Sequence, residues 1–144
     1  MNNLKKLLLP FVVVYVVSMI LNLLIHGVIL GSTYESPELS DMMRPAEESK
    51  MWIHFIVGII FSFFFVLIFS KGYENRGIMQ GVRYGLYVGL MVATPMAYSS
   101  YAAYQIPYSL ALQWFIYGLV YYIILGVIAG LLYKPKLAAA PAAS

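Results

Sequence analysis

The chain has no cysteine, and only 10% of its 144 residues carry a charge. The absence of cysteine excludes disulfides, thiolate metal sites, Cys-x-x-Cys redox motifs and a cysteine nucleophile. An ordinary soluble domain has roughly 25% charged residues, well above the fraction found here. Hydrophobic residues instead make up 62% of the chain. This composition is typical of a membrane protein.

Four long apolar stretches account for this composition. They cover residues 7–30, 51–70, 81–104 and 109–133. Each stretch can cross the hydrocarbon layer, which is roughly 30 Å thick and takes about 20 apolar residues in an α-helix. We therefore expect an all-α protein, an integral membrane four-helix bundle. A single domain over residues 1–136 would form it, and a flexible Ala/Pro-rich tail over 137–144 would follow.

The charges between the stretches are sorted by sign. Most of the basic residues fall on one side of the expected bundle: Lys5, Lys6, Lys71, Arg76, Arg83, Lys134 and Lys136. The first connection, residues 31–50, is acidic instead. Because short loops rich in Lys and Arg stay in the cytoplasm, we expect both termini to be cytoplasmic. Basic residues beside span ends face anionic lipid, so we do not expect nucleic acid as a partner.

Glycines recur at spacings of four or eight residues in three of the stretches. They are Gly27 and Gly31, then Gly81, Gly85 and Gly89, and finally Gly118, Gly126 and Gly130. In lipid, small residues on one face let two helix backbones approach, and van der Waals packing then holds the helices together. We expect these glycines to pack helices within the chain. The alternative is a seam between copies of the chain, formed by the glycines of residues 81–89.

Two local features follow from the prolines. Pro95 removes a backbone donor inside the third stretch, so we expect a kink there. The acidic connection has room between its prolines for a short amphipathic helix, about Glu38 to Met43, lying at the membrane interface.

Polar residues inside the stretches gather toward the outer surface. Asn22 and His26 lie four residues apart, so they share one face of the first helix. His54 lies at similar depth on the second helix, and Gln113 at similar depth on the fourth. Polar groups are costly in lipid unless they face the bundle interior or water. These residues therefore predict a polar pocket that opens outward.

Three roles are open for His26 and His54. They could hydrogen-bond their neighbours and do nothing more. They could ligate a metal or a haem iron, because imidazole is the usual neutral metal ligand. They could instead handle a ligand or a proton, since histidine titrates near neutral pH. Separately, a series of tyrosines at the outer span ends could stack on a pigment or a quinone: Tyr98, Tyr101, Tyr104 and Tyr108.

Catalytic signatures are missing from the sequence. No Asp, Glu, Lys or Arg lies at the centre of a stretch, which argues against small proton-coupled transporters, since these need an intramembrane carboxylate. The chain also lacks a Ser-His-Asp order, a phosphate-binding glycine loop and His-Glu-x-x-His. We therefore expect no catalytic residue and no cofactor other than a histidine-ligated one such as haem.

Two functions are compatible with these observations. The first is a non-catalytic accessory or scaffolding subunit that packs against larger membrane protein subunits, or against copies of itself, within the lipid. The second is a ligand-binding or transport protein whose site is the polar pocket around His26 and His54. In that case the pocket could hold haem, a metal or a pigment.

Short motifs are spread along nearly the whole chain. They are His26-Gly27 followed by Tyr34, Arg44-Pro45, Lys71-Gly72-Tyr73-Glu74, Gly81-x-Arg83-Tyr84-Gly85-Leu86, Pro95-Met96, Ile106-Pro107, Trp114-Phe115 and Tyr133-Lys134-Pro135. Together they resemble a group of small four-span bacterial inner-membrane proteins of unassigned function. The resemblance implies a four-span fold in the bacterial cytoplasmic (inner) membrane, and it implies no chemistry.

Overall fold

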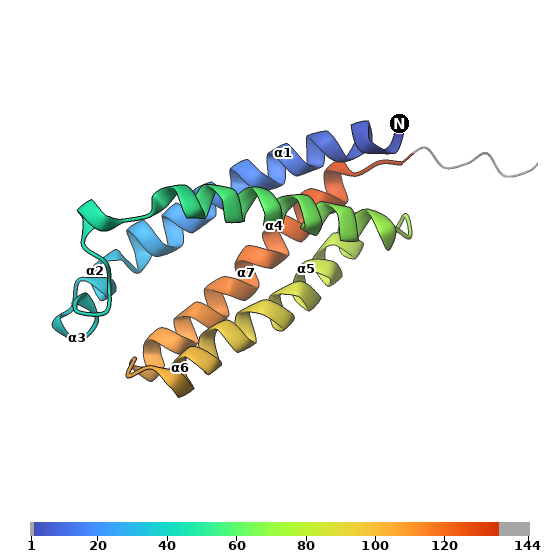
Figure 1. The fold of residues 1–144 in the computed structure, drawn as a ribbon. Coiled ribbons are helices and arrows are strands. Elements are labelled where there is room, and N and C mark those ends of the chain that lie inside the picture. The colour runs from blue at the N-terminus through green and yellow to red at the C-terminus, as the bar shows by residue number, and fades with distance from the viewer. Residues whose placement is uncertain (1, 136–144) are drawn as a thin grey trace, which may run out of the picture.

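The computed structural model describes residues 2–135, so Lys136 and the tail expected over 137–144 lie outside the described residues. Within the described chain there are helices and turns and no strand, which confirms the all-α prediction (Figure 1). Three helices are long and apolar enough to cross a membrane: Leu4–Ile29, Met51–Lys71 and Tyr108–Leu132.

The long helices are α1 (Asn2–Asn22), α4 (Met51–Lys71), α5 (Gly77–Thr94) and α7 (Tyr108–Leu132). Two of them continue as π-helices, since η1 (Leu23–Ile29) extends α1 and η3 (Pro95–Ser99) extends α5 into the short α6 (Ser100–Ala103). The acidic connection carries α2 (Gly31–Tyr34), α3 (Pro37–Ser40) and the 3-10 turn η2 (Ala46–Glu48).

The two features expected around the prolines differ in detail from the prediction. At Pro95 the helix changes from α to π geometry. Proline has no backbone N–H, so the regular α-helical hydrogen bond is missing at this position. The short helix in the acidic connection is α3, which begins at Pro37 and ends at Ser40, earlier than the expected Glu38 to Met43. It begins there because the fixed φ of proline suits the first helical position.

The helices run lengthwise between two ends that differ in charge. The start of α1, the α4–α5 turn and the end of α7 lie together at one end, which we call the basic end (Figure 1). Basic residues at this end are Lys5, Lys6, Lys71, Arg76 and Lys134. Helices α2 and α3, with the connection from α6 to α7, lie at the opposite end, the acidic end (Figure 1).

The α4–α5 turn is held by one side chain. The Gln80 amide nitrogen donates to the Gly72 carbonyl oxygen at 2.7 Å, and its amide oxygen accepts from the backbone N–H of Glu74 at 3.0 Å. Asn75 and Gly77 adopt positive φ, at 57° and 62°, which reverses the chain within a few residues. These bonds satisfy a carbonyl at the end of α4 and an N–H in the turn before α5, so α5 starts antiparallel to α4.

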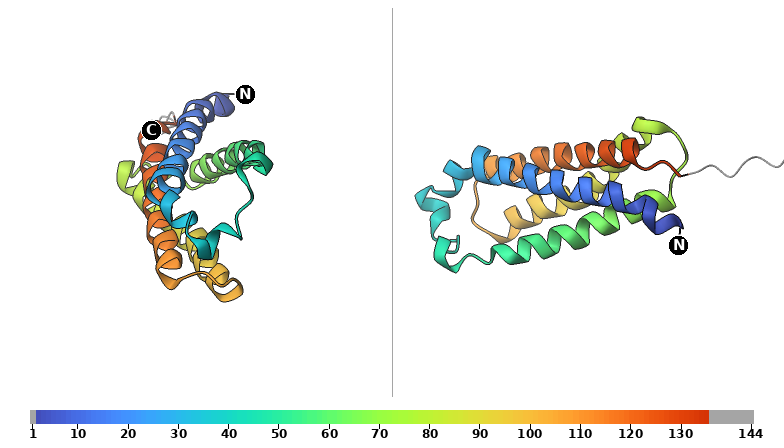
Figure 2. Two further views of the ribbon diagram at one scale, coloured as in Figure 1. Left: turned by 90° about the vertical axis from the view of Figure 1, so that its left-hand side faces the viewer. Right: turned by 90° about the horizontal axis from the view of Figure 1, so that it is seen from above.

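Helices α5 and α7 lie side by side through their glycines (Figures 1 and 2). A methyl group added to Gly81 would overlap the carbonyl oxygen of Gly126, and one added to Gly126 would overlap that of Gly81. A methyl group at Gly85 would lie 2.7 Å from Ile123 Cα. The other close positions along the two helices are Gly89, Gly118 and Gly130. The glycines of residues 81–89 therefore face a helix of the same chain.

The remaining glycines lie in different surroundings. A methyl group at Gly27 would meet only the Leu23 side chain of its own helix, and Gly31 has open space around it. Gly58 instead lies where α4 crosses α1, because the side chain of Met19 covers it. The contact of α1 with α4 thus uses a glycine that the spacing pattern does not contain.

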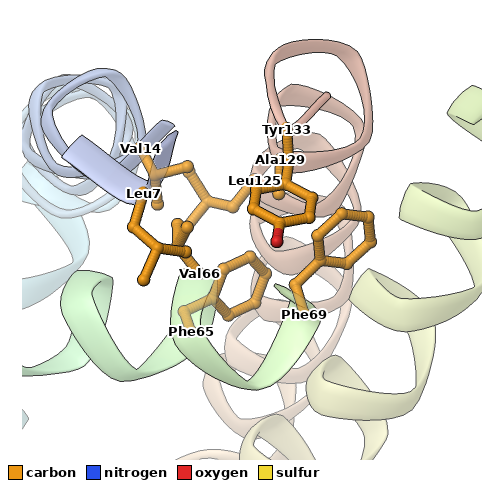
Figure 3. Packing of buried hydrophobic residues seen from close by; sticks show 8 residues of the cluster. All are labelled: Leu7, Val14, Phe65, Val66, Phe69, Leu125, Ala129 and Tyr133. Atoms are coloured by element: carbon orange, nitrogen blue, oxygen red, sulfur yellow. The ribbon is translucent and has the colours of Figure 1, made fainter. Parts of the chain in front are cut away.

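At the basic end, α1, α4 and α7 share a hydrophobic core (Figure 3). Its buried members are Leu7, Val14, Phe65, Val66, Phe69, Leu125, Ala129 and Tyr133. Helix α5 joins this core through Tyr84, whose hydroxyl donates to the Phe65 carbonyl oxygen of α4 at 2.7 Å. Toward the acidic end α4 and α5 diverge, because α4 follows α1 whereas α5 follows α7 (Figure 1).

Replacing Gly85 with alanine should lower the free energy of unfolding by about 1–3 kcal/mol, since the new methyl group meets backbone atoms that cannot move aside easily. The matched control is Gly31→Ala, which adds the same methyl group in open space. Thermal unfolding of both variants in detergent, followed by circular dichroism, measures the difference. Equal midpoints would contradict the close α5–α7 packing.

Candidate functional site

A cavity of about 380 Å³ lies between the diverging helices, in the half of the bundle near the acidic end. Its polar and aromatic lining includes Asn22, His26, His54, Trp114, Tyr117 and Tyr121. Both π-helices reach it, because His26 belongs to η1 and Met96 to η3. Single π-helical turns occur frequently at functional sites, so the position of both beside one cavity marks it as the candidate site.

Three polar side chains form a hydrogen-bonded chain at this cavity. The Trp114 indole Nε1–H donates to the Tyr34 hydroxyl oxygen at 2.8 Å. The same hydroxyl lies 2.7 Å from His26 Nδ1, and the two rings are nearly parallel, with an interplanar angle of 15°. We call these residues the His26–Tyr34–Trp114 chain. The second ring nitrogen of His26, Nε2, takes no part in these hydrogen bonds, and His26 also lines the cavity.

The position of Tyr34 depends on the π-helix before it. The Leu30 N–H donates to the Ile25 carbonyl oxygen at 2.9 Å, five residues back, which widens the last turn before α2 begins. Leu30 is then buried in a second hydrophobic cluster with Leu39, Ile106, Leu110 and Ala111. This cluster fixes α2 and α3 against the start of α7. Tyr34 and Trp114 are brought together as a result.

Tyr34 remains a protonated phenol under ordinary conditions. Burial raises the pKa of its hydroxyl above the usual range, and the hydrogen bond from Trp114 opposes this shift. The phenol therefore offers one proton and two lone pairs at neutral pH. It can accept from Trp114 and still either donate to His26 Nδ1 or accept from it.

The structure brings three of the four expected pocket residues together. Asn22, His26 and His54 line the cavity, whereas Gln113 does not. At 3.6 residues per turn, Gln113 points about 100° around α7 from Trp114, beyond the edge of the arc that faces the cavity. Trp114 is the residue from which the sequence could have indicated this face of α7, because an indole N–H away from water usually finds a hydrogen-bond acceptor.

An apolar groove of about 440 Å³ continues from the cavity between α4 and α5. The cavity and the groove share Val57, Phe61 and Val92. The groove then follows α4 toward the basic end as far as Ile68. Its one polar side chain, Tyr84, uses its hydroxyl for the bond to the Phe65 carbonyl oxygen, so the groove presents a hydrocarbon surface.

Two further sites that the sequence left open were tyrosine stacking on a pigment or quinone and a metal site at the histidines. The tyrosines near the α6–α7 connection pack on one another, with ring centroids 6.4 Å apart for Tyr98 and Tyr108 and 5.6 Å apart for Tyr101 and Tyr108. Within residues 2–135, no group of three or more His, Asp or Glu side chains comes together to hold a metal ion. The acidic connection therefore adds no carboxylate to the two histidines.

Replacing Tyr34 with phenylalanine should lower the free energy of unfolding by about 1–3 kcal/mol, because the Trp114 N–H loses its acceptor inside the protein. The indole N–H resonance of Trp114 should also move in a nitrogen-15 NMR spectrum. Tyr104→Phe is the control, since Tyr104 is 60% exposed. An unchanged Trp114 resonance in the Tyr34 variant would contradict the hydrogen-bonded chain.

Comparison of the chain with models of protein families, with curated proteins and with solved structures gave no match.

Proposed function

We propose that the protein spans the bacterial inner membrane four times, with both termini in the cytoplasm. The helical run from Gly77 to Ala103 supports a fourth span, since at roughly 1.5 Å per residue it is about 40 Å long and it lies against α7. The charges support the orientation, because the basic end carries the lysines and arginines that stay in the cytoplasm and the opposite connection is acidic.

We propose further that the protein is a non-catalytic ligand-binding protein, and that the cavity beside the His26–Tyr34–Trp114 chain is its site. The hydrogen-bonded His26–Tyr34–Trp114 chain is the observation that carries the proposal. Ligand sites are mostly apolar cavities in which a few well-placed polar groups fix the orientation of the ligand. The cavity meets this description, since His26, His54 and Asn22 project from apolar helices into a space of about 380 Å³.

The cost of these polar groups favours binding over a purely structural role. Polar side chains at membrane depth are costly unless they find partners or water. Tyr34 and Trp114 satisfy each other and one nitrogen of His26, but His54 is exposed, on a helix whose neighbouring residues are apolar. A hydrogen-bonding ligand in the cavity would give His54 and the free nitrogen of His26 their partners.

An accessory or scaffolding role is the second proposal. The observation in its favour is the first part of α4, residues 51–57, where every residue is exposed. The exposed fractions of Trp52, Phe55 and Val57 are 62%, 50% and 57%. A helix of a larger membrane subunit, or of a second copy, would cover this surface and bury its aromatic side chains.

Purification from native membranes in mild detergent should yield a small molecule in stoichiometric amount, detected by mass spectrometry of the extract. The double variant His26→Ala with His54→Ala should lose most of it, whereas the control Ile53→Ala should retain it, since Ile53 does not line the cavity. If only larger protein subunits co-purify, the accessory role is supported instead. If the double variant retains the molecule fully, the cavity is not its site.

The absence of cysteine makes the topology directly testable with single-cysteine variants and a membrane-impermeant maleimide. Glu47→Cys and Tyr104→Cys should react in right-side-out spheroplasts, whereas Glu74→Cys should react only in inside-out vesicles. All three positions are exposed. Labelling of Tyr104→Cys from the same side as Glu74→Cys would show that α5 does not cross the membrane, and complete reversal of the pattern would contradict the orientation.

A further inference from the structure

We infer that the cavity and the adjoining groove together bind a prenylated quinone, with its ring in the cavity and its isoprenoid tail in the groove. The inference rests on the proposed ligand-binding function and names the class of ligand. It is carried by the contrast between the two spaces, since a cavity lined by Asn22, His26 and His54 adjoins a groove whose lining is apolar apart from Tyr84.

The dimensions of the groove fit an extended tail. It begins at Val57, which also lines the cavity, and it ends at Ile68. At roughly 1.5 Å per residue, this part of α4 is about 16 Å long. A compact ligand such as a metal ion or a sugar would leave the groove unused. A ligand with a polar head and a long hydrocarbon tail would occupy both spaces and bury apolar surface along the whole groove.

The polar groups of the cavity fit a quinone ring. If Tyr34 donates to His26 Nδ1, the neutral imidazole carries its proton on Nε2 and can donate to a quinone carbonyl oxygen. If Nδ1 donates to Tyr34, then Nε2 can accept from a quinol hydroxyl. His54 lines the same cavity from α4 and is the residue that we assign to the second oxygen of the ring. The same pair of histidines thus accommodates the oxidised and the reduced head.

The lining also discriminates against charged head groups. No Lys or Arg is among the residues that line the cavity, although these are the side chains that bind phosphates and carboxylates. A phospholipid head or the carboxylates of haem would lie there without a cationic partner. The walls are instead aromatic, with Phe61, Tyr117 and Trp114 available to pack on a planar neutral ring.

The groove provides a path from the bilayer to the site. Its side chains Ile60, Phe64 and Ile68 are 54%, 52% and 57% exposed, and Met91 on the facing α5 is 69% exposed. A lipid-soluble ligand can therefore enter laterally, between α4 and α5. It would not have to pass through water.

Fluorescence of Trp114 tests the inference, because a quinone near an indole quenches its emission. The variant Trp52→Phe leaves Trp114 as the single tryptophan, and Trp52 does not line the cavity. In lipid nanodiscs, a short-chain ubiquinone should quench this emission saturably. The His26→Ala and His54→Ala variants should each bind roughly tenfold more weakly, the effect of about one lost hydrogen bond.

The tail is tested with a matched pair of substitutions. Ile60→Phe should weaken binding of the prenylated quinone because it fills the groove, whereas Ile59→Phe should not, since Ile59 lies outside the groove lining. Ubiquinone without a tail should bind at least tenfold more weakly than the prenylated form to the unsubstituted protein. Equal effects of the two substitutions, or equal binding of both quinones, would overturn the tail assignment.

The two proposals fail in different ways. If the extract of native protein contains a phospholipid or haem in place of quinone, and added quinone does not quench Trp114, the quinone inference is wrong while the ligand-binding function stands. If no small molecule co-purifies and no added quinone, haem or phospholipid changes Trp114 emission, the ligand-binding function itself is wrong.

Discussion

The close approach of the α5 and α7 backbones is the constraint on which the rest of the structure depends. Gly81 and Gly126 meet with no side chain between them, and further glycines along both helices keep α5 packed against α7. Helix α4 packs on α1 by a different contact, in which the side chain of Met19 lies on Gly58. The core at the basic end and the cluster around Leu30 join the two pairs. Between these two places α4 and α5 separate, and the cavity and groove result.

Polar side chains lie beside the cavity between α4 and α5, and some of them form hydrogen bonds with one another. Inside lipid, backbone donors and acceptors must find partners within the protein, and polar side chains are costly without partners or water. Tyr34 and Trp114 meet this demand across the bundle, and the π-helical turn of η1 places the phenol where both neighbours can reach it. His54 and one nitrogen of His26 line the cavity beside them. An architecture held by backbone contacts thus leaves these polar groups beside a cavity.

Much of this arrangement could be predicted from local sequence patterns, but the hydrogen bond between Trp114 and Tyr34 could not. Apolar length predicted the long helices, Pro95 predicted a kink where the structure has a π-helix, and equal depth predicted that His26 and His54 would lie close together, as they do in lining one cavity. The bond from Trp114 to Tyr34 joins residues far apart in the chain, and it depends on the rotation of α7 and on the π-helical turn of η1. Neither the rotation of α7 nor the π-helical turn leaves a periodic pattern in the sequence. The same rotation turns Gln113 away from the cavity.

A bound ligand would keep α4 and α5 apart around the cavity and the groove. A cryo-electron microscopy structure of the protein purified from native membranes, with no ligand added, would show whether the two spaces are occupied. We expect continuous elongated density that begins between His26 and His54 and follows the groove to Ile68. A map in which α4 packs against α5, with Phe61 and Val92 in contact and no density between them, would show that the two helices enclose no ligand.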